Sequence, residues 1–507
     1  MDSILSNALM GLEVALMPTN LWFCFLGVFL GTILGVIPGI GVLVAISLLF
    51  PITFHIEPVA ALVMLGGIYY GTTYGGSTSS ILLNVPGTPS SAVACLDGYP
   101  MAQKGRAGTA LFMTTVASFF GGTVGIIALM GFSPMIAASA LKFGSAEYFG
   151  LMVLGLVAAS TIASGSMFKG IAMVLIGILM GLVGSDVYTG TLRFTFGQMA
   201  LFEGISIIAL AMGIFGVSEV ITSIRSVKRA GNADHDITFR AMLPTRAEMR
   251  ASWMPMIRGS AIGSFFGALP GTGGLIASYM SYATEKRIGR AEEFGKGAIQ
   301  GVTGPESANN AADQTAFIPT LTLGIPGSPT MAIILGVLII HGIEPGPMVL
   351  VNQPDLFWGL VMSFWVGNLM LLVLNIPMVG LWVRLLKIPF HLMYPAILMF
   401  IVMGVLTTYN NVIQVWVLLL LGAFGYVLRY LGFQAAPLIL GFVLGPMMEE
   451  HFRRTLMLSG GDFGAFFDSA ISQVCLGSAV ALVLYGLYVS FSGRARRGKA
   501  GEAVNEG

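Results

Sequence analysis

Long apolar stretches without a single Asp, Glu, Lys or Arg dominate the chain. These charge-free runs are residues 14–56, 58–96, 107–141, 314–343, 356–383, 388–428 and 469–493. Because a helix of about 20 apolar residues crosses a bilayer, each run has room for one or two crossings. Further apolar spans lie near 148–166, 168–185, 201–222 and 432–447. The pattern predicts an all-α polytopic protein, multi-pass in a lipid bilayer, with about 10–12 transmembrane helices plus re-entrant hairpins.

Composition supports this class and excludes several others. The chain is 55% hydrophobic and only 10% charged, with a mean hydropathy of +0.85, whereas soluble domains carry about 25% charged residues. A formal net charge of +1 argues against nucleic acid as a partner. The three cysteines and five histidines are scattered, and no nucleophile elbow, Walker loop or dinucleotide fingerprint is present. We therefore expect no enzyme activity, no cofactor, and no metal site other than one for a coupling ion.

A glycine-rich segment occurs twice in one register. Three glycines spaced four apart recur at a constant interval (259 − 27 = 232), as Gly27, Gly31 and Gly35 and again as Gly259, Gly263 and Gly267. This spacing creates a small-residue helix face that allows close packing. Each copy then runs into a Pro-Gly break, formed by Pro38, Gly39 and Gly41 and by Pro270, Gly271 and Gly273. A duplicated broken helix in apolar sequence indicates the central site of a transporter.

The duplication continues with a second Pro-Gly break in each half. The sequence PGTP at 86–89 corresponds to PGSP at 326–329 (326 − 86 = 240), and the longer interval indicates a modest insertion in the second half. We divide the chain into a first repeat half, a polar linker, a second repeat half and a basic, polar tail, at 1–225, 226–258, 259–493 and 494–507.

The distribution of basic residues predicts how the halves are oriented. The linker and the tail carry an excess of Lys and Arg, which favours the cytoplasmic side, whereas the residues before the first glycine helix carry Asp2 and Glu13 and no basic residue. The first copy is therefore expected to enter from outside and the second from the cytoplasm. This arrangement predicts two inverted repeats, related by a pseudo-two-fold axis in the membrane plane.

The second breaks have chemistry that suits a carboxylate. Proline removes an amide donor and disfavours helix in the residue before it, and free backbone groups survive in a membrane only inside protein or beside water, as at a hairpin tip. Freed amides at a helix N-terminus, together with hydroxyls, bind anions. The candidate substrate-binding residues are Ser77, Thr78, Ser79, Asn84, Gly87 and Thr88 in the first half, and Ser307, Asn310, Gly327, Ser328 and Thr330 in the second. For any single hydroxyl, the alternative is a bond within its own helix or between packed helices.

Two acidic residues lie next to the charge-free run that begins at residue 314. Acidic residues inside a membrane are functional candidates by default. Asp313 is our first candidate for binding a coupling Na⁺ or H⁺, with Asn309 and Asn310 supplying neutral oxygens. Glu306 is either a second such residue or an interfacial residue at a helix start beside Pro305.

Six segments together resemble one known family: GVIPGIG (35–41), YGGSTSSILLNVPGTP (74–89), DGYPMAQKGRAG (97–108), GALPGTGG (267–274), GPESANNAADQ (304–314) and LGIPGSP (323–329). They are similar to the large membrane subunit of the tripartite tricarboxylate transporter family, the TctA-type permease. The resemblance extends over nearly the whole chain.

The resemblance implies secondary-active uptake across the bacterial inner membrane. In this family a periplasmic binding protein delivers a small organic acid, a tricarboxylate such as citrate or a related acid, to the large subunit. A small four-helix membrane subunit works with it, and a Na⁺ or H⁺ gradient drives symport in place of ATP. The alternative functions are an ion channel and a stand-alone carboxylate or anion transporter.

Overall fold

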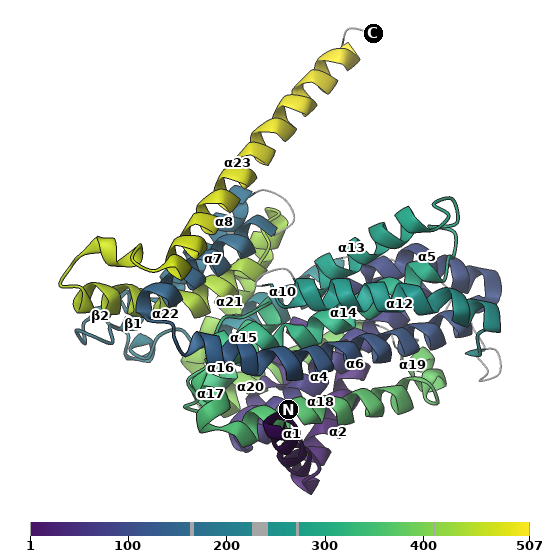
Figure 1. The fold of residues 1–507 in the computed structure, drawn as a ribbon, viewed down its shortest axis with the longest axis horizontal. Helices are drawn as coiled ribbons and strands as arrows, with labels where there is room; N and C mark the ends of the chain where they lie inside the picture. The colour runs from purple at the N-terminus through teal and green to yellow at the C-terminus, as the bar shows by residue number, and fades with distance from the viewer. Residues whose placement is uncertain are drawn as a thin grey trace. The chain divides into compact units, whose positions relative to one another are not determined.

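The computed structural model describes residues 2–162, 167–225, 242–269, 273–386, 388, 390–409 and 411–505. Within these residues the chain is helical almost throughout (Figure 1), and its β structure is one antiparallel pair of two-residue strands, β1 (Gly184–Ser185) and β2 (Leu192–Arg193). Five helical segments of the described part of the chain are long and apolar enough to cross a membrane, and shorter apolar helices accompany them. The predicted all-α polytopic membrane fold is confirmed.

The described chain divides into two compact units, and the first comprises Met1–Leu141 and Ser206–Tyr426. Its helices before the linker are α1 (Asp2–Ala15), α2 (Pro18–Val36), α3 (Val42–Leu49), η1 (Phe50–His55), α4 (Pro58–Leu83), η2 (Ser90–Val93), α5 (Ala94–Met101), η3 (Ala102–Arg106), α6 (Ala107–Ala140), α9 (Ile207–Ala211), η5 (Met212–Val217) and α10 (Ser218–Arg225). Those after it are α12 (Arg246–Gly267), α13 (Gly273–Ile288), α14 (Gln300–Thr315), α15 (Phe317–Leu323), α16 (Pro329–Ile340), α17 (Met348–Asn352), α18 (Pro354–Asn375), α19 (Val379–Leu385), α20 (Phe390–Tyr409) and most of α21 (Val412–Tyr430).

The second unit comprises Lys142–Ile205 and Val427–Gly507. Its elements are α7 (Ser145–Ile162), α8 (Met167–Gly181), the two strands, η4 (Met199–Leu201), α22 (Ala436–Leu458), η6 (Phe463–Phe466) and α23 (Ala470–Asn505). Four charges of alternating sign join the strand loop to α22: Arg453 lies 3.0 Å from Asp186 and 2.7 Å from Glu449, and Arg193 pairs with the same two acids. This network fixes the loop on the end of α22.

The expected segment boundaries fall partly on described residues. Residues 226–241 of the expected linker lie outside them. Within the remainder of that segment, α12 already begins at Arg246, where the Thr245 side chain and Glu248 form a capping box. At the other end of the chain, α23 continues to Asn505, through most of the expected tail.

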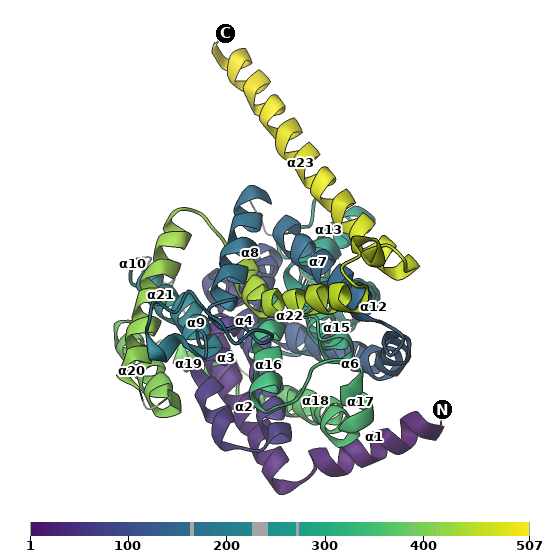
Figure 2. The ribbon, with the colours of Figure 1, turned by 90° about the vertical axis from the view of Figure 1, so that its left-hand side faces the viewer.

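Close glycine contacts hold α2 parallel to α4. A Cβ would collide with the partner backbone at three pairs with a constant interval (64 − 27 = 37): Gly27 with Met64, Gly31 with Ile68, and Gly35 with Thr72. The second half repeats this contact between α12 and α14 (304 − 259 = 45): Gly259 with Gly304, Gly263 with Ala308, and Gly267 with Ala312. Figure 1 shows α12 beside α14, and Figure 2 shows α2, α3 and α4 together. A constant interval means that both helices of each pair run in the same direction.

The first glycine helix stops halfway along its partner. α2 ends at Val36, level with Thr73 in the middle of α4, and residues 37–41 are not helical, with Gly39 at φ +86°. From this level the chain must return through α3 and η1 to the start of α4 at Pro58. Along α4, the distance from Thr73 back to Pro58 is about 22 Å at 1.5 Å per residue. α2 and α3 therefore form a helical hairpin beside α4.

The second glycine helix behaves in the same way. α12 ends at Gly267, level with Ala312, and α13 begins at Gly273, which has φ +60°. Of the expected break, Pro270 and Gly271 lie outside the described residues. α13 then leads back to the level at which α14 begins, so α12 and α13 form a second hairpin.

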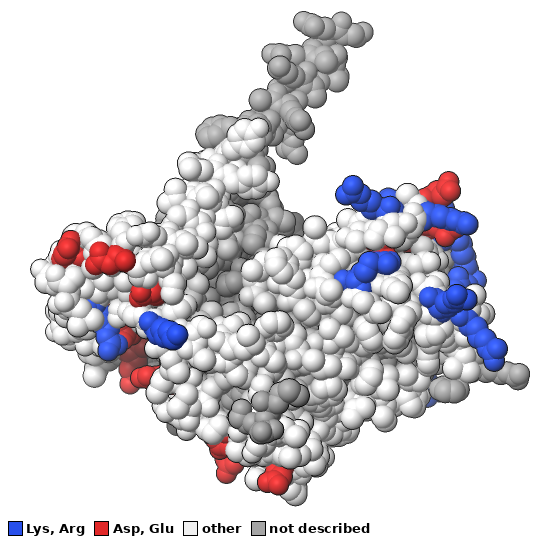
Figure 3. All heavy atoms as spheres, in the orientation of Figure 1, with Lys and Arg blue, Asp and Glu red and all other residues white. Residues whose placement is uncertain are grey.

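The two ends of the first unit differ in charge. Lys and Arg gather at the end where η3 lies, α12 begins and α13 ends (Figure 3). Lys104 donates to the Lys296 carbonyl, and Arg106 pairs with Glu248, which ties this end together. The other end carries Glu57 at the start of α4 and Asp355 at the start of α18. One end of the helix bundle is thus basic and the other acidic.

Candidate functional site

The polar helices α4 and α14 cross in antiparallel directions inside the first unit. Ser77, late in α4, donates to Glu306, early in α14 (2.8 Å). Tyr69 and Thr73, earlier in α4, donate to Asp313, late in α14. As the residue numbers rise along α4, the numbers of their partners fall along α14, as antiparallel packing requires. The crossing therefore joins polar side chains from the two halves of the sequence.

Asp313 lies at the centre of this crossing. Its Oδ1 accepts from the Tyr69 hydroxyl at 2.7 Å and its Oδ2 from the Thr73 hydroxyl at 2.9 Å, and the residue is only 3% exposed. The second hairpin also reaches it, because a Cβ on Gly274 would lie 3.0 Å from Oδ1. The neighbouring Gly273 borders Ser328 in the same way, at 3.8 Å from its Cβ. The second hairpin turn thus adjoins both the acid and the second Pro-Gly loop.

Glu306 lies two helical turns before Asp313 on the same helix. Its carboxylate accepts from Ser77, and at 3.4 Å from Ser118 of α6 and from the amide nitrogen of Asn309. Glu306 is 1% exposed and is the seventh residue of α14, which begins at Gln300. Of the two interpretations of Glu306, the structure favours the interior residue over the helix-start residue at an interface.

Neither buried carboxylate has a basic partner. Among the residues that the structure describes, the ion pairs involve neither Glu306 nor Asp313, and every donor to them is a neutral hydroxyl or amide. An isolated buried carboxylate is unstable as an anion, so it takes up a proton or a cation unless a base compensates it. The crossing is therefore chemically suited to bind positive charge.

Asn309 and Asn310 turn toward Glu306. The Asn310 amide nitrogen donates to the Glu306 carbonyl at 2.9 Å and to the Asn309 side-chain oxygen at 2.6 Å, while Asn309 itself donates to the Glu306 carboxylate. The backbone carbonyl of Asn309 lies on the other side, next to Gly274 and hence near Asp313. The oxygen that Asn309 offers near Asp313 is thus its carbonyl.

The first Pro-Gly loop folds back onto α4. Asn84 ends this helix in a left-handed conformation and is exposed, and Gly87 then donates to the Gly76 carbonyl at 3.4 Å. A Cβ on Gly87 would lie 2.6 Å from the Gly35 carbonyl oxygen, so the loop also touches the end of α2. The remaining candidates nearby, Thr78, Ser79 and Thr88, are buried. The loop and the first hairpin turn therefore lie together.

The second Pro-Gly loop has the corresponding form. Gly324 ends α15 in a left-handed conformation, and Gly327 donates to the Thr320 hydroxyl at 3.3 Å. Ser328 caps α16 by accepting from the Met331 amide at 3.3 Å, and Thr330 follows in the first turn of that helix. Ser328 and Thr330, two of the residues expected to bind substrate, thus lie at the N-terminus of α16.

Ser307 faces away from the crossing. Its hydroxyl shares a hydrogen bond of 2.6 Å with Ser260 and donates to the Met256 carbonyl at 2.8 Å, both on α12. It belongs to the face of α14 that packs on the second glycine helix. In the structure Ser307 therefore fits the alternative given above for a single hydroxyl, which is a hydrogen bond between packed helices.

Ser307→Ala is expected to preserve uptake, and Ser77→Ala to impair it. The first change removes a helix-packing bond worth about 1 kcal/mol, whereas the second removes the closest donor to Glu306. Uptake and thermal unfolding of the two variants measure this difference. Equal loss of uptake in both would place Ser307 in the transport site.

The tyrosines of α4 were not among our sequence-based candidates. Tyr69 reaches Asp313, Tyr70 donates to Gln314, and Tyr74 donates to Asn368 of α18 at 2.8 Å. Their signal is present in the sequence, because polar-tipped aromatic residues recur in YYGTTYGG inside a charge-free run. Buried tyrosine hydroxyls require partners, which predicts polar groups on the facing helix.

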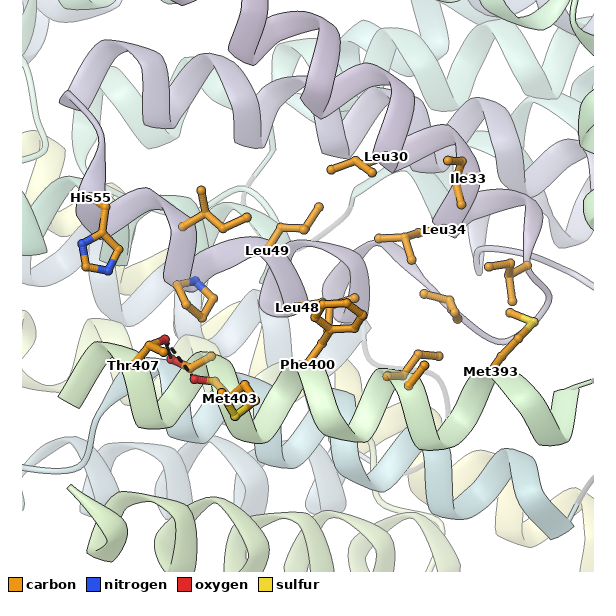
Figure 4. A pocket seen from close by; sticks show the side chains of 17 residues that line it. Leu30, Ile33, Leu34, Leu48, Leu49, His55, Met393, Phe400, Met403 and Thr407 are labelled. Atoms are coloured by element: carbon orange, nitrogen blue, oxygen red, sulfur yellow. Dashed lines mark hydrogen bonds between the residues drawn. The ribbon is translucent and has the colours of Figure 1, made fainter. Parts of the chain in front are cut away.

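A pocket of ≈ 550 Å³ lies elsewhere in the first unit, between α2, α3, η1 and α20. Figure 4 shows Leu30, Leu34, Leu48 and Phe400 lining it, with His55 and Thr407 at one end. Its lining is almost wholly apolar and offers no cluster of donors for a carboxylate. The buried acidic and hydroxyl side chains described above lie instead at the crossing of α4 and α14.

Known proteins resemble the chain over most of its length. Residues 21–440 match the family described as "Tripartite tricarboxylate transporter TctA family". The "Uncharacterized 52.8 kDa protein in TAR-I ttuC' 3'region" of Agrobacterium vitis is 47% identical over 503 residues, 98% of this chain and 99% of that protein. The "Uncharacterized protein in TAR-II ttuC' 3'region" of the same organism is 50% identical over 229 residues, 45% of this chain and 95% of that protein. No solved structure matches significantly. Since the match includes both hairpins and both Pro-Gly loops, this multi-pass membrane protein belongs to the tripartite tricarboxylate transporter TctA family.

Proposed function

We propose that the chain is the permease subunit that imports a tricarboxylate or related organic acid across the bacterial inner membrane, coupled to a Na⁺ or H⁺ gradient. Family membership supports a transporter in preference to an enzyme, together with a periplasmic binding protein and a small membrane subunit as partners. The observation that carries the coupling is the pair of buried carboxylates, which have no basic partner among the described residues.

The proposed architecture is an inverted repeat. Within each half the glycine helix runs parallel to its polar partner, whereas the two polar helices are antiparallel to each other. If α4 crosses the bilayer, α14 crosses it in the opposite direction, which supports a two-fold axis in the membrane plane. The basic end of the first unit faces the cytoplasm by the positive-inside rule. Two re-entrant hairpins then approach the midplane from opposite sides.

The substrate carboxylates bind at the two Pro-Gly loops. Thr88 in the first loop and Ser328 in the second supply hydroxyls, and the N-terminus of α16 supplies backbone amides. Both loops fold back toward the level of the crossing, beside the two hairpin turns. Neutral donors suit a transported anion, because they bind it less tightly than a charged Lys or Arg side chain would and so allow its release.

The coupling cation binds at Asp313. The carboxylate and the hydroxyls of Tyr69 and Thr73 provide oxygens in contact with one another, and the carbonyl of Asn309 faces Gly274 beside them. Such hard oxygen ligands suit Na⁺, and the same carboxylate can carry a proton. Cation binding neutralises the crossing and thereby favours the approach of an anionic substrate.

Imposed gradients test this function. Cells that express the full chain with the binding protein and the small membrane subunit should accumulate labelled citrate or a related acid, and an inward Na⁺ or H⁺ gradient should drive it. An ionophore that collapses the driving gradient should stop accumulation. Accumulation that persists without either gradient, or that requires ATP directly, would refute the proposal.

A further inference from the structure

The two halves correspond contact by contact at fixed intervals. The glycine helices differ by 232 positions, while their partners on α4 and α14 differ by 240 (304 − 64). With these two intervals each close contact of the first half maps onto one of the second: Gly27–Met64 onto Gly259–Gly304, Gly31–Ile68 onto Gly263–Ala308, and Gly35–Thr72 onto Gly267–Ala312. The match of contacts, and not only of residue types, shows that the glycine helix packs on its polar partner in the same way in both halves.

The interval of 240 also holds beyond these helices. Asn84 and Gly324 are both left-handed residues that end a helix. The loops that follow fold back onto equivalent residues, since a Cβ on Gly87 would meet Gly76 and a Cβ on Gly327 would meet Ala316. The correspondence therefore extends through the whole segment from α4 to the second break.

Thr73 and Asp313 are themselves equivalent by this interval (313 − 73 = 240), and they touch. The Thr73 hydroxyl donates to Asp313 Oδ2 at 2.9 Å. In a two-fold arrangement a residue reaches its own equivalent only at the axis, whereas away from the axis it reaches a different one. The pseudo-two-fold axis that relates α4 to α14 thus passes between these two side chains.

The hairpin turns reach the same point from the two sides. α2 ends level with Thr73, and α12 ends level with Ala312, next to Asp313. A cation bound on the axis contacts the same sequence position in each half. It therefore stays in place when the two halves exchange conformations. A site there needs no counterpart elsewhere in the repeat.

We propose that Thr73 and Asp313 are the two equivalent halves of one cation site on this axis, with the carboxylate supplied by the second half and a hydroxyl by the first. This inference rests on the proposed cation coupling. It adds that either half can supply the carboxylate, as long as the other supplies the hydroxyl. A carboxylate placed at 73 would reach the same point from the opposite helix. It would then face a hydroxyl at 313 and Asn309, the equivalent of Tyr69 (309 − 69 = 240).

The exchange variant Thr73→Asp/Asp313→Thr tests the proposal. Asp313→Thr alone should lose the dependence of uptake on the driving cation, and Thr73→Asp alone should lose it too, because two carboxylates would face each other. The double variant should regain at least about tenfold more cation-dependent uptake than Asp313→Thr, since restored charge contacts are worth a few kcal/mol.

Thr72 provides the matched control. It is adjacent on α4 and equally buried, and its backbone packs under Gly35. Its hydroxyl donates to its own helix at Ile68, whereas that of Thr73 reaches Asp313 in addition to the Tyr69 carbonyl of its own helix. Thr72→Asp/Asp313→Thr carries the same charges at a position away from the axis. It should show no recovery, and recovery equal to that of the exchange variant would overturn the proposal.

A gentler pair of variants decides the question if the exchange variant does not insert. Thr73→Val and Thr72→Val keep the side-chain shape and remove one hydroxyl each. Thr73→Val should raise the cation concentration for half-maximal uptake by about tenfold, as the loss of one polar contact implies, and Thr72→Val should leave it unchanged. An unchanged value in Thr73→Val would remove Thr73 from the site.

Failure of this inference is separable from failure of the proposed function. If wild-type uptake responds to neither a Na⁺ nor an H⁺ gradient, the coupling itself is refuted. If the wild type is cation-dependent and Asp313→Asn is not, yet neither the exchange nor Thr73→Val behaves as expected, only the shared site on the axis is refuted.

Discussion

Uptake by the Asp313→Asn variant is expected to lose its response to the driving cation. The amide keeps the size of the side chain, and its oxygen can still accept from one of the two hydroxyls of Tyr69 and Thr73 while its NH2 group donates to the other. It removes the carboxylate proposed to bind the cation, however, and the loss of one partner from a buried charge pair costs about 2–5 kcal/mol, or about 30- to 3,000-fold in binding. Initial uptake rates at several imposed gradients measure the effect.

Asp355→Asn is the matched control for this experiment. Asp355 lies exposed at the start of α18, on the acidic end of the first unit. The same chemical change there should leave uptake and its cation response intact. A normal cation response in Asp313→Asn, with the protein present in the membrane, would remove Asp313 from the mechanism.

Gly87→Ala is expected to block transport, while Gly327→Ala should be tolerated. A Cβ on Gly87 would lie 2.6 Å from the Gly35 carbonyl oxygen and 2.8 Å from the Ser79 hydroxyl, so the loop must move away from the hairpin turn. A Cβ on Gly327 would lie 3.1 Å or more from its neighbours on Ala316, which small shifts accommodate. Overpacking of this kind costs about 1–3 kcal/mol, or about 5- to 150-fold.

The two glycine variants control for each other. They occupy equivalent positions in the two halves, so a difference between them reports the local space and not the type of substitution. Uptake is compared at equal amounts of protein in the membrane. Equal activity of the two variants would show that the space around Gly87 does not limit transport.

The broken helices were predictable because their cause is local. Pro38 and the glycines after it end α2, since proline disfavours helix in the residue before it and Gly39 adopts a left-handed conformation. Single prolines without such glycines, Pro255 in α12 and Pro305 in α14, lie inside their helices. Spacing also predicted which face of α2 would pack closely, because glycines four apart form one helix face. Neither observation indicated the partner of that face.

The composition of the site was less predictable than its existence. Asp313 was recognisable as an acid beside a charge-free run, but Tyr69 and Thr73, its donors, lie 240 or more residues away in sequence. Ser307, two residues from Asn309 in the same polar motif, turned out to face α12. The motif contains polar residues on several faces of α14, and only the neighbours of each face determine what it contacts.

The sequence by itself determined the membrane class, the duplication and the places where helices break, since each depends on hydrophobicity and backbone conformation over a few adjacent residues. Only the tertiary structure decided that α4 meets α14 antiparallel, that Glu306 lies in the interior, and that Thr73 touches its own equivalent, Asp313. The physical reason is that helix pairing here depends on close backbone approach at glycines. That approach selects one face among several that are similarly apolar, and no local pattern in the sequence encodes the choice.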